Sequence, residues 1–345
     1  MKIDYRLEAD ASNMKAMILG WPERFSVAWK VGREIGRTVP VEPPSALVWV
    51  GMGGSAVGGD FVAAMLRAHA SFPVFVHRGG PLPAWVDDSC RVQLVSYSGN
   101  TAETLATAEE AVQRQCAVDV LTSGGTLEQW AKGHEIHPWI IEGGRPPRTA
   151  LPDMLAFTLG VLHGRGWVEI ADADLSEGLT LLQHAGDELA KAPGEGHAIE
   201  HLIEQALVRH MMIYGSGRFA PVARRWACQL NENAKRTAHW GELPEMNHNE
   251  VVPLREGSPW SRVTGILLLD DPFAPDDVRV RVEATASIAS ETGWGVEIVR
   301  PTADGPLAQL LELTLVGDWL SYWLALAQGI DPTPIPTIER LKSMI

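Results

Sequence analysis

Short apolar runs recur through the first half of the chain and alternate with segments of helical spacing. The runs are ALVWVGM (46–52), PVFVHR (73–78), VQLVSYS (92–98), AVDVLTS (117–123) and HPWIIEG (137–143). Each is too short for a helix and too apolar for a strand with one solvated face, so we expect buried strands. Strands that alternate with helices form parallel sheets covered on both faces. The pattern therefore predicts an α/β fold with a doubly wound parallel sheet sandwiched between helices.

The second half repeats this pattern more loosely. HMMIYGSG (210–217), VTGILLLDD (263–271) and WGVEIVR (294–300) are predicted strands, with helical segments after the last two. VWVGMGGSA and MIYGSGRFA occupy equivalent places in two α/β halves. The segment KAPGEGHA (191–198) interrupts the helical pattern between them with Pro and Gly. We predict one domain over residues 1–190 and another over residues 191–345.

Charge and composition exclude several classes of function. A formal net charge of -14 argues against a general nucleic-acid binder, which needs a basic surface. A local anion site built from backbone N–H groups and one or two arginines stays compatible with that charge. No apolar stretch is expected to span a membrane, and the start MKIDYRLEADAS lacks the apolar core of a signal peptide. Three widely spaced cysteines predict free thiols in a cytoplasmic protein and no metal site.

The turn GMGGSAVGGD (51–60) follows the first predicted strand and opens a helix. Gly51, Gly53 and Ala56 fit the G-x-G-x-x-A pattern of dinucleotide binders. The acidic residue expected after the second strand is missing, and that strand ends in His77 and Arg78. Arg78 could accept a 2′-phosphate, so an NADP-dependent reductase is one alternative, and an ordinary tight turn is another.

The turn SYSGNTAET (96–104) is more informative. Its hydroxyl residues nearest the strand end are Ser96, Ser98 and Thr101. A helix N-terminus favours an anion because its first N–H groups are unpaired. A capping box of Asn100 and Glu103 would explain part of the pattern. It would not explain the two serines, or Ser55 at the neighbouring strand end, so we predict a phosphate pocket at the carboxyl edge of the sheet.

The segment NENAKRTAHWGELPEMNHNEVV (231–252) contains four carboxylates, two histidines and four asparagines. Such a segment could be the solvated end of a helix or the wall of a catalytic pocket. Taken alone, Glu232 would be expected at an exposed helix end and His248 in an ordinary loop. His239 and Glu242 are expected to be solvated loop residues.

The two turns, together with PPRTALP, LNENAK and PEMNHNEVV, resemble the bifunctional phosphoglucose/phosphomannose isomerases of the sugar isomerase (SIS) domain superfamily. The resemblance runs through nearly the whole chain in order. It implies two tandem SIS domains, each with a five-stranded parallel sheet. It also implies a homodimer with active sites at the subunit interface. The implied activity is a metal-independent interconversion of glucose 6-phosphate and mannose 6-phosphate with fructose 6-phosphate, with no cofactor.

The resemblance also assigns roles to individual residues. The phosphate-binding hydroxyls would be those of Ser55, Ser96, Ser98 and Thr101. Gly53, Gly54 and Arg148 would lie near the substrate. Glu232 would move the proton, His248 of the neighbouring subunit would open the sugar ring, and Lys342 would act at the ring oxygen.

The sequence leaves open the role of Arg225 and the alternative of a non-catalytic regulator. Arg225, in ARRW, is a possible source of positive charge for an enediolate, although the resemblance does not assign it. A sugar-phosphate-binding regulator with the same fold would need only the hydroxyl pocket. Glu232 and His248 argue against such a regulator, because binding alone requires neither a base nor a ring-opening acid.

Overall fold

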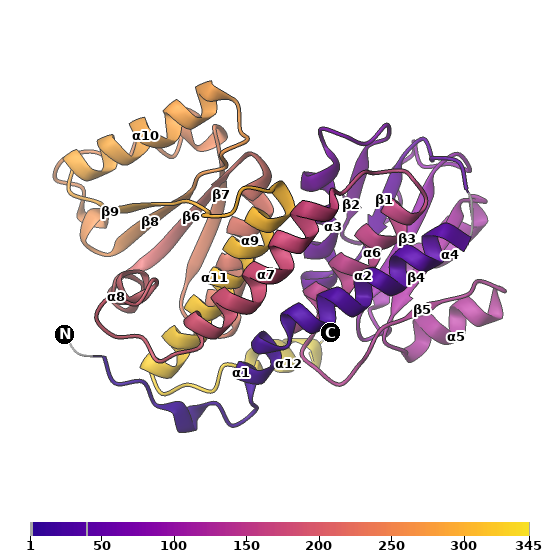
Figure 1. Ribbon diagram of the computed structural model, residues 1–345, viewed down its shortest axis with the longest axis horizontal. Coiled ribbons are helices and arrows are strands. Elements are labelled where there is room, and N and C mark those ends of the chain that lie inside the picture. The colour runs from indigo at the N-terminus through magenta and orange to yellow at the C-terminus, as the bar shows by residue number, and fades with distance from the viewer. Residues whose placement is uncertain (1–2, 39–40, 345) are drawn as a thin grey trace. The chain divides into compact units, whose positions relative to one another are not determined.

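The computed structural model describes residues 3–38 and 41–344, which fold as two compact units. The first unit comprises residues 21–172, and the second comprises residues 1–20 together with 173–345. Each unit contains one parallel β-sheet with helices packed on it (Figure 1). The predicted α/β class is therefore confirmed.

The sheet of the first unit has five parallel strands in the order β2-β1-β3-β4-β5. They are β1 (Leu47–Val50), β2 (Val74–His77), β3 (Arg91–Ser96), β4 (Ala117–Thr122) and β5 (Trp139–Ile140). All five predicted runs form strands. The helices of this unit are α2 (Trp21–Thr38), α3 (Gly53–Leu66), α4 (Ala102–Gln113), α5 (Gly125–Gly133), η2 (Pro147–Thr149) and α6 (Leu151–Gly164).

Helices α2 and α6 approach each other through glycines on both helices. A Cβ atom on Gly32 would lie 2.1 Å from the Phe157 carbonyl oxygen, and one on Gly36 would lie 2.3 Å from that of Val161. In the other direction, a Cβ on Gly160 would lie 2.5 Å from the Trp29 carbonyl oxygen. The two backbones therefore touch, which only residues without a side chain allow.

The sheet of the second unit has four parallel strands among the described residues, in the order β7-β6-β8-β9. They are β6 (His210–Ser216), β7 (Ala238–Leu243), β8 (Thr264–Leu269) and β9 (Gly295–Val299). The helices are η1 (Leu7–Ala9), α1 (Met14–Leu19), α7 (Asp172–Leu189), α8 (Glu200–Val208), η3 (Gly217–Phe219), α9 (Ala220–Glu232), η4 (Glu245–His248), η5 (Pro259–Arg262), α10 (Asp276–Glu291), α11 (Pro306–Ala327) and α12 (Pro336–Lys342).

Two expectations about the second unit are wrong. The implied five-stranded sheet has four strands in the part of the chain described. His239 and Glu242 lie on the edge strand β7 and not in a loop. Strand β7 escapes detection because three of its six residues, His239, Trp240 and Glu242, are exposed. An edge strand of this kind lacks the continuous apolar run that marks a buried strand.

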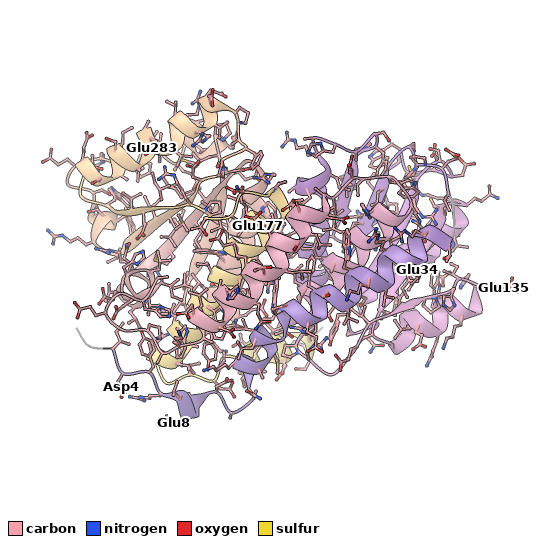
Figure 2. All side chains as sticks on the ribbon, in the orientation of Figure 1. Asp4, Glu8, Glu34, Glu135, Glu177 and Glu283 are labelled. Atoms are coloured by element: carbon pink, nitrogen blue, oxygen red, sulfur yellow. The ribbon has the colours of Figure 1, made fainter. Side chains whose placement is uncertain are left out.

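Helix α7 packs with the second unit, so the structural division falls near residue 172 and differs from the predicted boundary at 190. Asp174 accepts hydrogen bonds from the N–H groups of Leu307 and Ala308 at 3.0 and 2.9 Å. Glu177 accepts two more, at 2.8 Å each, from Asp304 and Gly305 (Figure 2). These two carboxylates satisfy the N-terminus of α11, where negative charge is favourable.

Helix α11 forms the core of the second unit. By length and composition it could cross a membrane, which differs from the expectation that no apolar stretch is long enough. In its most apolar window, however, 89% of the residues are buried in the structure. Trp319 and Trp323 are both fully buried, and the Trp323 indole N–H donates to the Leu189 carbonyl of α7 at 2.7 Å. These contacts explain its apolar composition as that of a core helix.

The glycine contacts of α2 and α6 predict the effect of one added methyl group. Gly160→Ala should lower the free energy of unfolding by about 1–3 kcal/mol, because the new Cβ must push the helices apart. Urea unfolding would measure this. Gly133→Ala, in helix α5 of the same unit, is the matched control, because a Cβ there meets no atom within 4 Å. The control should be neutral or slightly stabilising, and equal stability of the two variants would contradict the close contact.

Candidate active site

Hydroxyl groups from two neighbouring strand ends meet in the first unit. Ser96 is the last residue of β3, and its Oγ lies 2.9 Å from the Thr101 Oγ1. Ser55, at the start of α3, accepts a hydrogen bond on its Oγ from the Tyr97 N–H at 3.2 Å. Ser98 is exposed, and its Oγ accepts from the Asn100 N–H at 3.3 Å. The structure therefore brings together the four predicted phosphate-binding residues.

The turn that carries these hydroxyls depends on Gly99. This residue has φ 69°, and a Cβ atom on it would lie 1.8 Å from the Gly124 carbonyl oxygen. The capping box of Asn100 and Glu103, which was the alternative to a phosphate pocket, is not formed. Thr101 is the N-cap residue of α4, and the Asn100 Oδ1 accepts from the N–H and hydroxyl of Thr126 at 3.0 and 2.9 Å. Asn100 thus fixes the turn to α5 and does not cap its own helix.

Two helices begin beside the hydroxyl groups. Their N-cap residues are Met52 for α3 and Thr101 for α4, and neither side chain caps its helix in the described structure. The first N–H groups of both helices are therefore oriented toward the same edge of the sheet. Such N–H groups, together with the helix dipoles, bind an anion.

Arg148 lies next to the first of these helix starts. It belongs to η2 and is 5% exposed. A Cβ atom on Gly54 would lie 3.3 Å from the Arg148 Cα, so the glycine allows the two segments to touch. Nearby, Glu142 forms an ion pair with Arg145 at 2.6 Å.

The loop that carries Arg148 is tied to the serine-rich turn. The Tyr97 hydroxyl donates to the Glu142 carbonyl at 3.1 Å and accepts from the Arg145 N–H at 3.2 Å. Arg145 and Arg24 both contact Asp153, at 3.1 and 2.7 Å. Burial raises the pKa of Asp153, although the two guanidinium groups oppose this effect. These contacts hold the arginine loop against the hydroxyl cluster.

Arg78 does not offer a free cation for a 2′-phosphate. Its guanidinium forms an ion pair with Asp60 on α3. The carboxylate neutralises the charge on which the NADP alternative depended. The reductase hypothesis therefore rests only on the glycine pattern of the first turn, which also suits a phosphate pocket.

Glu232 is the last residue of α9, in the second unit, and is half-buried. Both neighbours are fixed by hydrogen bonds. The Asn231 side chain donates to the Ala238 carbonyl at 3.0 Å and accepts from its N–H at 3.1 Å. The Asn233 side chain, fully buried, donates to the Ser321 hydroxyl at 2.9 Å. The helix end that carries Glu232 is therefore held on both sides.

His248 ends η4 and is exposed. The Asn247 side chain donates to the Thr285 hydroxyl of α10 at 2.7 Å. The buried Tyr214 hydroxyl donates to the Glu250 carboxylate, also at 2.7 Å, and burial followed by this bond raises the pKa of Tyr214. The segment around His248 is therefore anchored while its imidazole stays accessible.

The sheet of the second unit separates Glu232 from His248. Helix α10 covers one face of this sheet, and α9 and α11 cover the other (Figure 1). Met246 of η4 packs in the core cluster on the α10 face, together with Val282 and Tyr214. Glu232 belongs to the α9 face. The two residues of one chain therefore lie on opposite sides of a β-sheet.

Comparison with known proteins places the chain in a family. A model of the bacterial phospho-glucose isomerase C-terminal SIS domain matches residues 200–345. A bifunctional phosphoglucose/phosphomannose isomerase from Aquifex aeolicus is 34% identical over 303 residues, which cover 87% of this chain and 90% of that protein. The one from Caldicellulosiruptor bescii is 29% identical over 326 residues, or 94% and 96% of the two chains. The chain belongs to this isomerase family.

A solved structure shows the same fold. The C-terminal domain of glucosamine-fructose-6-phosphate aminotransferase from Francisella tularensis aligns with a TM-score of 0.67 at 15% identity. The alignment covers 93% of this chain and 98% of that one. The chain therefore shares the fold of that domain over most of its length.

The other predicted site residues of this family member differ in their surroundings. Lys342 is the last residue of α12, a helix that buries none of its residues. Arg225 is 2% exposed and donates to both carboxylate oxygens of Asp318 at 3.0 and 2.8 Å. Gln229 donates to the same carboxylate at 2.9 Å. This buried pair neutralises Arg225 inside the second unit, which argues against its role as a cation for an enediolate.

The isomerase has a second glycine turn, Gly215–Gly217 at the end of β6. A carboxylate of the protein itself fills this turn. Asp271 is 1% exposed and accepts from the Arg218 N–H at 2.7 Å, near the start of α9. It also accepts from the Arg218 Nε at 3.0 Å and from the Phe273 N–H at 2.9 Å. This internal carboxylate takes the place that an anionic ligand could take. The sequence did not reveal it, because Asp271 lies 56 positions from Gly215, the first glycine of that turn.

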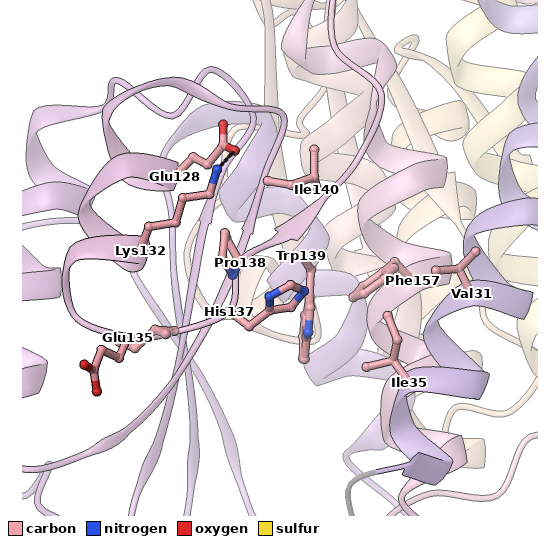
Figure 3. A pocket seen from close by; sticks show the side chains of 11 residues that line it. Val31, Ile35, Glu128, Lys132, Glu135, His137, Pro138, Trp139, Ile140 and Phe157 are labelled. Carbon is pink, nitrogen blue, oxygen red and sulfur yellow. Dashed lines mark hydrogen bonds and ion pairs between the residues drawn. The ribbon is translucent and has the colours of Figure 1, made fainter.

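One hollow of the first unit lies away from these residues (Figure 3). Its volume is about 540 Å³, and its walls come from α2, α5 and the segment before β5. The lining side chains include Val31, Ile35, Trp139 and the Glu128–Lys132 ion pair at 2.7 Å. None of the predicted site residues lines it. The hydroxyl cluster therefore remains the better candidate for the substrate site.

Proposed function

We propose that the chain is a metal-independent aldose–ketose isomerase that interconverts glucose 6-phosphate and mannose 6-phosphate with fructose 6-phosphate. The observation that carries the proposal is the cluster of Ser55, Ser96, Ser98 and Thr101 at the start of two helices. Membership of the isomerase family supplies the sugar class. The substrate phosphate would accept hydrogen bonds from these hydroxyls and from the helix N–H groups.

The phosphate serves as a binding handle remote from the reacting carbons. Binding energy gained there orients the sugar without touching C1 or C2. Gly53 and Gly54 start α3, and Arg148 of η2 lies against Gly54, so all three would contact the substrate beside its phosphate. This arrangement allows different C2 configurations to be bound by one pocket.

Ring opening requires one proton to reach the ring oxygen and another to leave the anomeric hydroxyl. A histidine can do both near neutral pH, which suits His248. Lys342 can donate a hydrogen bond to the ring oxygen and polarise it. Its place on the exposed helix α12 keeps the ammonium group accessible.

Isomerisation then moves a proton between C2 and C1. The Glu232 carboxylate removes the C2 proton to give a cis-enediol and returns it to C1, while a proton passes from O2 to O1. No electrons leave the substrate, so no cofactor is needed. Glucose and mannose 6-phosphates share this enediol because it has lost the C2 stereocentre, so one site serves both.

We further propose a homodimer with shared active sites, in which His248 of a second copy completes each site. The support is the sheet that separates Glu232 from His248 within one chain. A layer packed on a β-sheet lies about 10 Å from it. One hexose therefore cannot contact both Glu232 and His248 of the same chain through the sheet. The other proposed partner is the phosphorylated hexose. We propose no nucleic-acid partner and no membrane association, and we place the protein in the cytoplasm.

The activity can be tested by product analysis. Fructose 6-phosphate incubated with the protein and EDTA should yield both aldose phosphates, because the mechanism uses only protein acids and bases. Glu232→Gln keeps the size of the side chain and removes the proton acceptor, so kcat should fall by about 10²–10⁴ or more. Binding of the phosphosugar should persist.

Three results of these measurements would contradict the proposal. Activity lost in EDTA and restored by zinc would refute a metal-independent mechanism. A Glu232→Gln enzyme with normal turnover would refute the base. Tight phosphosugar binding by an inactive wild-type chain would instead indicate a regulator.

The hydroxyl cluster predicts a loss of affinity for the phosphate. Ser98→Ala or Thr101→Ala should weaken phosphosugar binding by roughly 1.5–3 kcal/mol, because each removes a hydrogen bond to a charged group. Ser176→Ala, at an exposed position of α7, is the control and should leave KM unchanged. Equal rates on free and phosphorylated sugar would contradict a phosphate pocket.

The shared site predicts complementation between two inactive variants. Glu232→Gln and His248→Ala subunits, mixed and allowed to exchange, would form about half mixed dimers. Each mixed dimer has one site with both lesions and one intact site, so about a quarter of wild-type activity should return. Verified subunit exchange without returning activity would mean that His248 acts within its own chain.

A further inference from the structure

Lys235 has a backbone conformation that lysine rarely adopts. Its φ angle is 52°, three residues after the end of α9. Glycine or asparagine fits this left-handed region at lower cost, and other residues lose roughly 1–2 kcal/mol there. The conformation alone would therefore favour glycine, so the lysine side chain itself must contribute something.

The Lys235 ammonium group lies among four backbone carbonyl oxygens. Its Nζ is 2.8 Å from the Glu232 oxygen and 3.2 Å from that of Asn233. It is 3.1 Å from the oxygens of both Asp331 and Pro332. An ammonium group has three hydrogens, so this set uses its full donor capacity. A positive charge at this point also complements the negative end of the α9 dipole.

The four carbonyl groups belong to two separate segments. One pair ends α9, whose last residue is Glu232. The other pair lies in the turn that precedes α12, whose last residue is Lys342. That turn is also held by the Asp331 carboxylate, which accepts from the Ser12 hydroxyl at 3.1 Å and from the Thr333 N–H at 2.9 Å. Lys235 therefore connects the end of α9, which carries Glu232, with the segment that leads to Lys342.

We infer that Lys235 is a positioning residue for the isomerase reaction, acting through the backbone of Glu232. The inference rests on the proposed function, because it assumes that Glu232 is the base. The ammonium group fixes the last turn of α9, and with it the carboxylate that must reach both C1 and C2. A misplacement of about 1 Å can cost on the order of a hundredfold in rate. Substrate affinity depends instead on the hydroxyl cluster of the other unit.

Lys235→Gly tests this inference, because glycine suits the backbone conformation and removes the ammonium group together with its methylene stem. We expect kcat to fall about tenfold to hundredfold, with KM changed by less than about threefold. Addition of n-butylammonium should restore part of kcat, whereas n-butanol should not. Lys191→Gly, which removes an exposed lysine paired with Glu188, is the control and should keep wild-type kcat.

Three results would overturn the inference: unchanged kcat in Lys235→Gly, an effect on KM alone, or no rescue by the amine. If Lys235→Gly folds poorly, Lys235→Asn makes the same test, since asparagine also tolerates the left-handed region. Failure of the proposed function is recognised separately. In that case the wild-type chain does not interconvert the phosphosugars, or Glu232→Gln keeps its turnover.

Discussion

Parallel strands impose one constraint on which the whole candidate site depends. The helix after each strand runs back antiparallel to it, so every such sheet has an edge where helices begin and an edge where they end. The proposed phosphate pocket lies where α3 and α4 begin, beside the first N–H groups of both helices. Glu232 lies where α9 ends, among carbonyl groups. An anion and a proton acceptor therefore occupy opposite kinds of helix terminus, in different units.

Several buried charges in the described part of the chain are neutralised by a charged partner. Asp271 fills the second glycine turn, and Asp318 neutralises the buried Arg225. Arg78 pairs with Asp60 beside the first turn. A buried charge without a partner would cost several kcal/mol. The first turn is different, because hydroxyl groups and helix N–H groups attract an anion there without requiring a carboxylate.

The ends of elements in the second unit are held by polar contacts to backbone groups. Lys235 fixes the end of α9, and Asn231 ties that end to β7. Tyr214 holds the segment after His248 through Glu250. Each contact positions a neighbour of a proposed catalytic side chain and leaves that side chain accessible. Rigidity around a site without crowding of the reactive groups is what proton transfer requires.

The sequence by itself determined the α/β class, eight of the nine strands, the hydroxyl turn and the family, because these depend on local apolar runs and contiguous motifs. Tertiary structure decided the rest. The edge strand β7, with exposed His239 and Trp240, has no buried pattern to detect. The placement of α7 with the second unit and the filling of the second turn by Asp271 depend on partners distant in the chain. Likewise, only the folded sheet could place Glu232 and His248 on opposite faces, because residues 16 positions apart in sequence carry no sign of the layer between them.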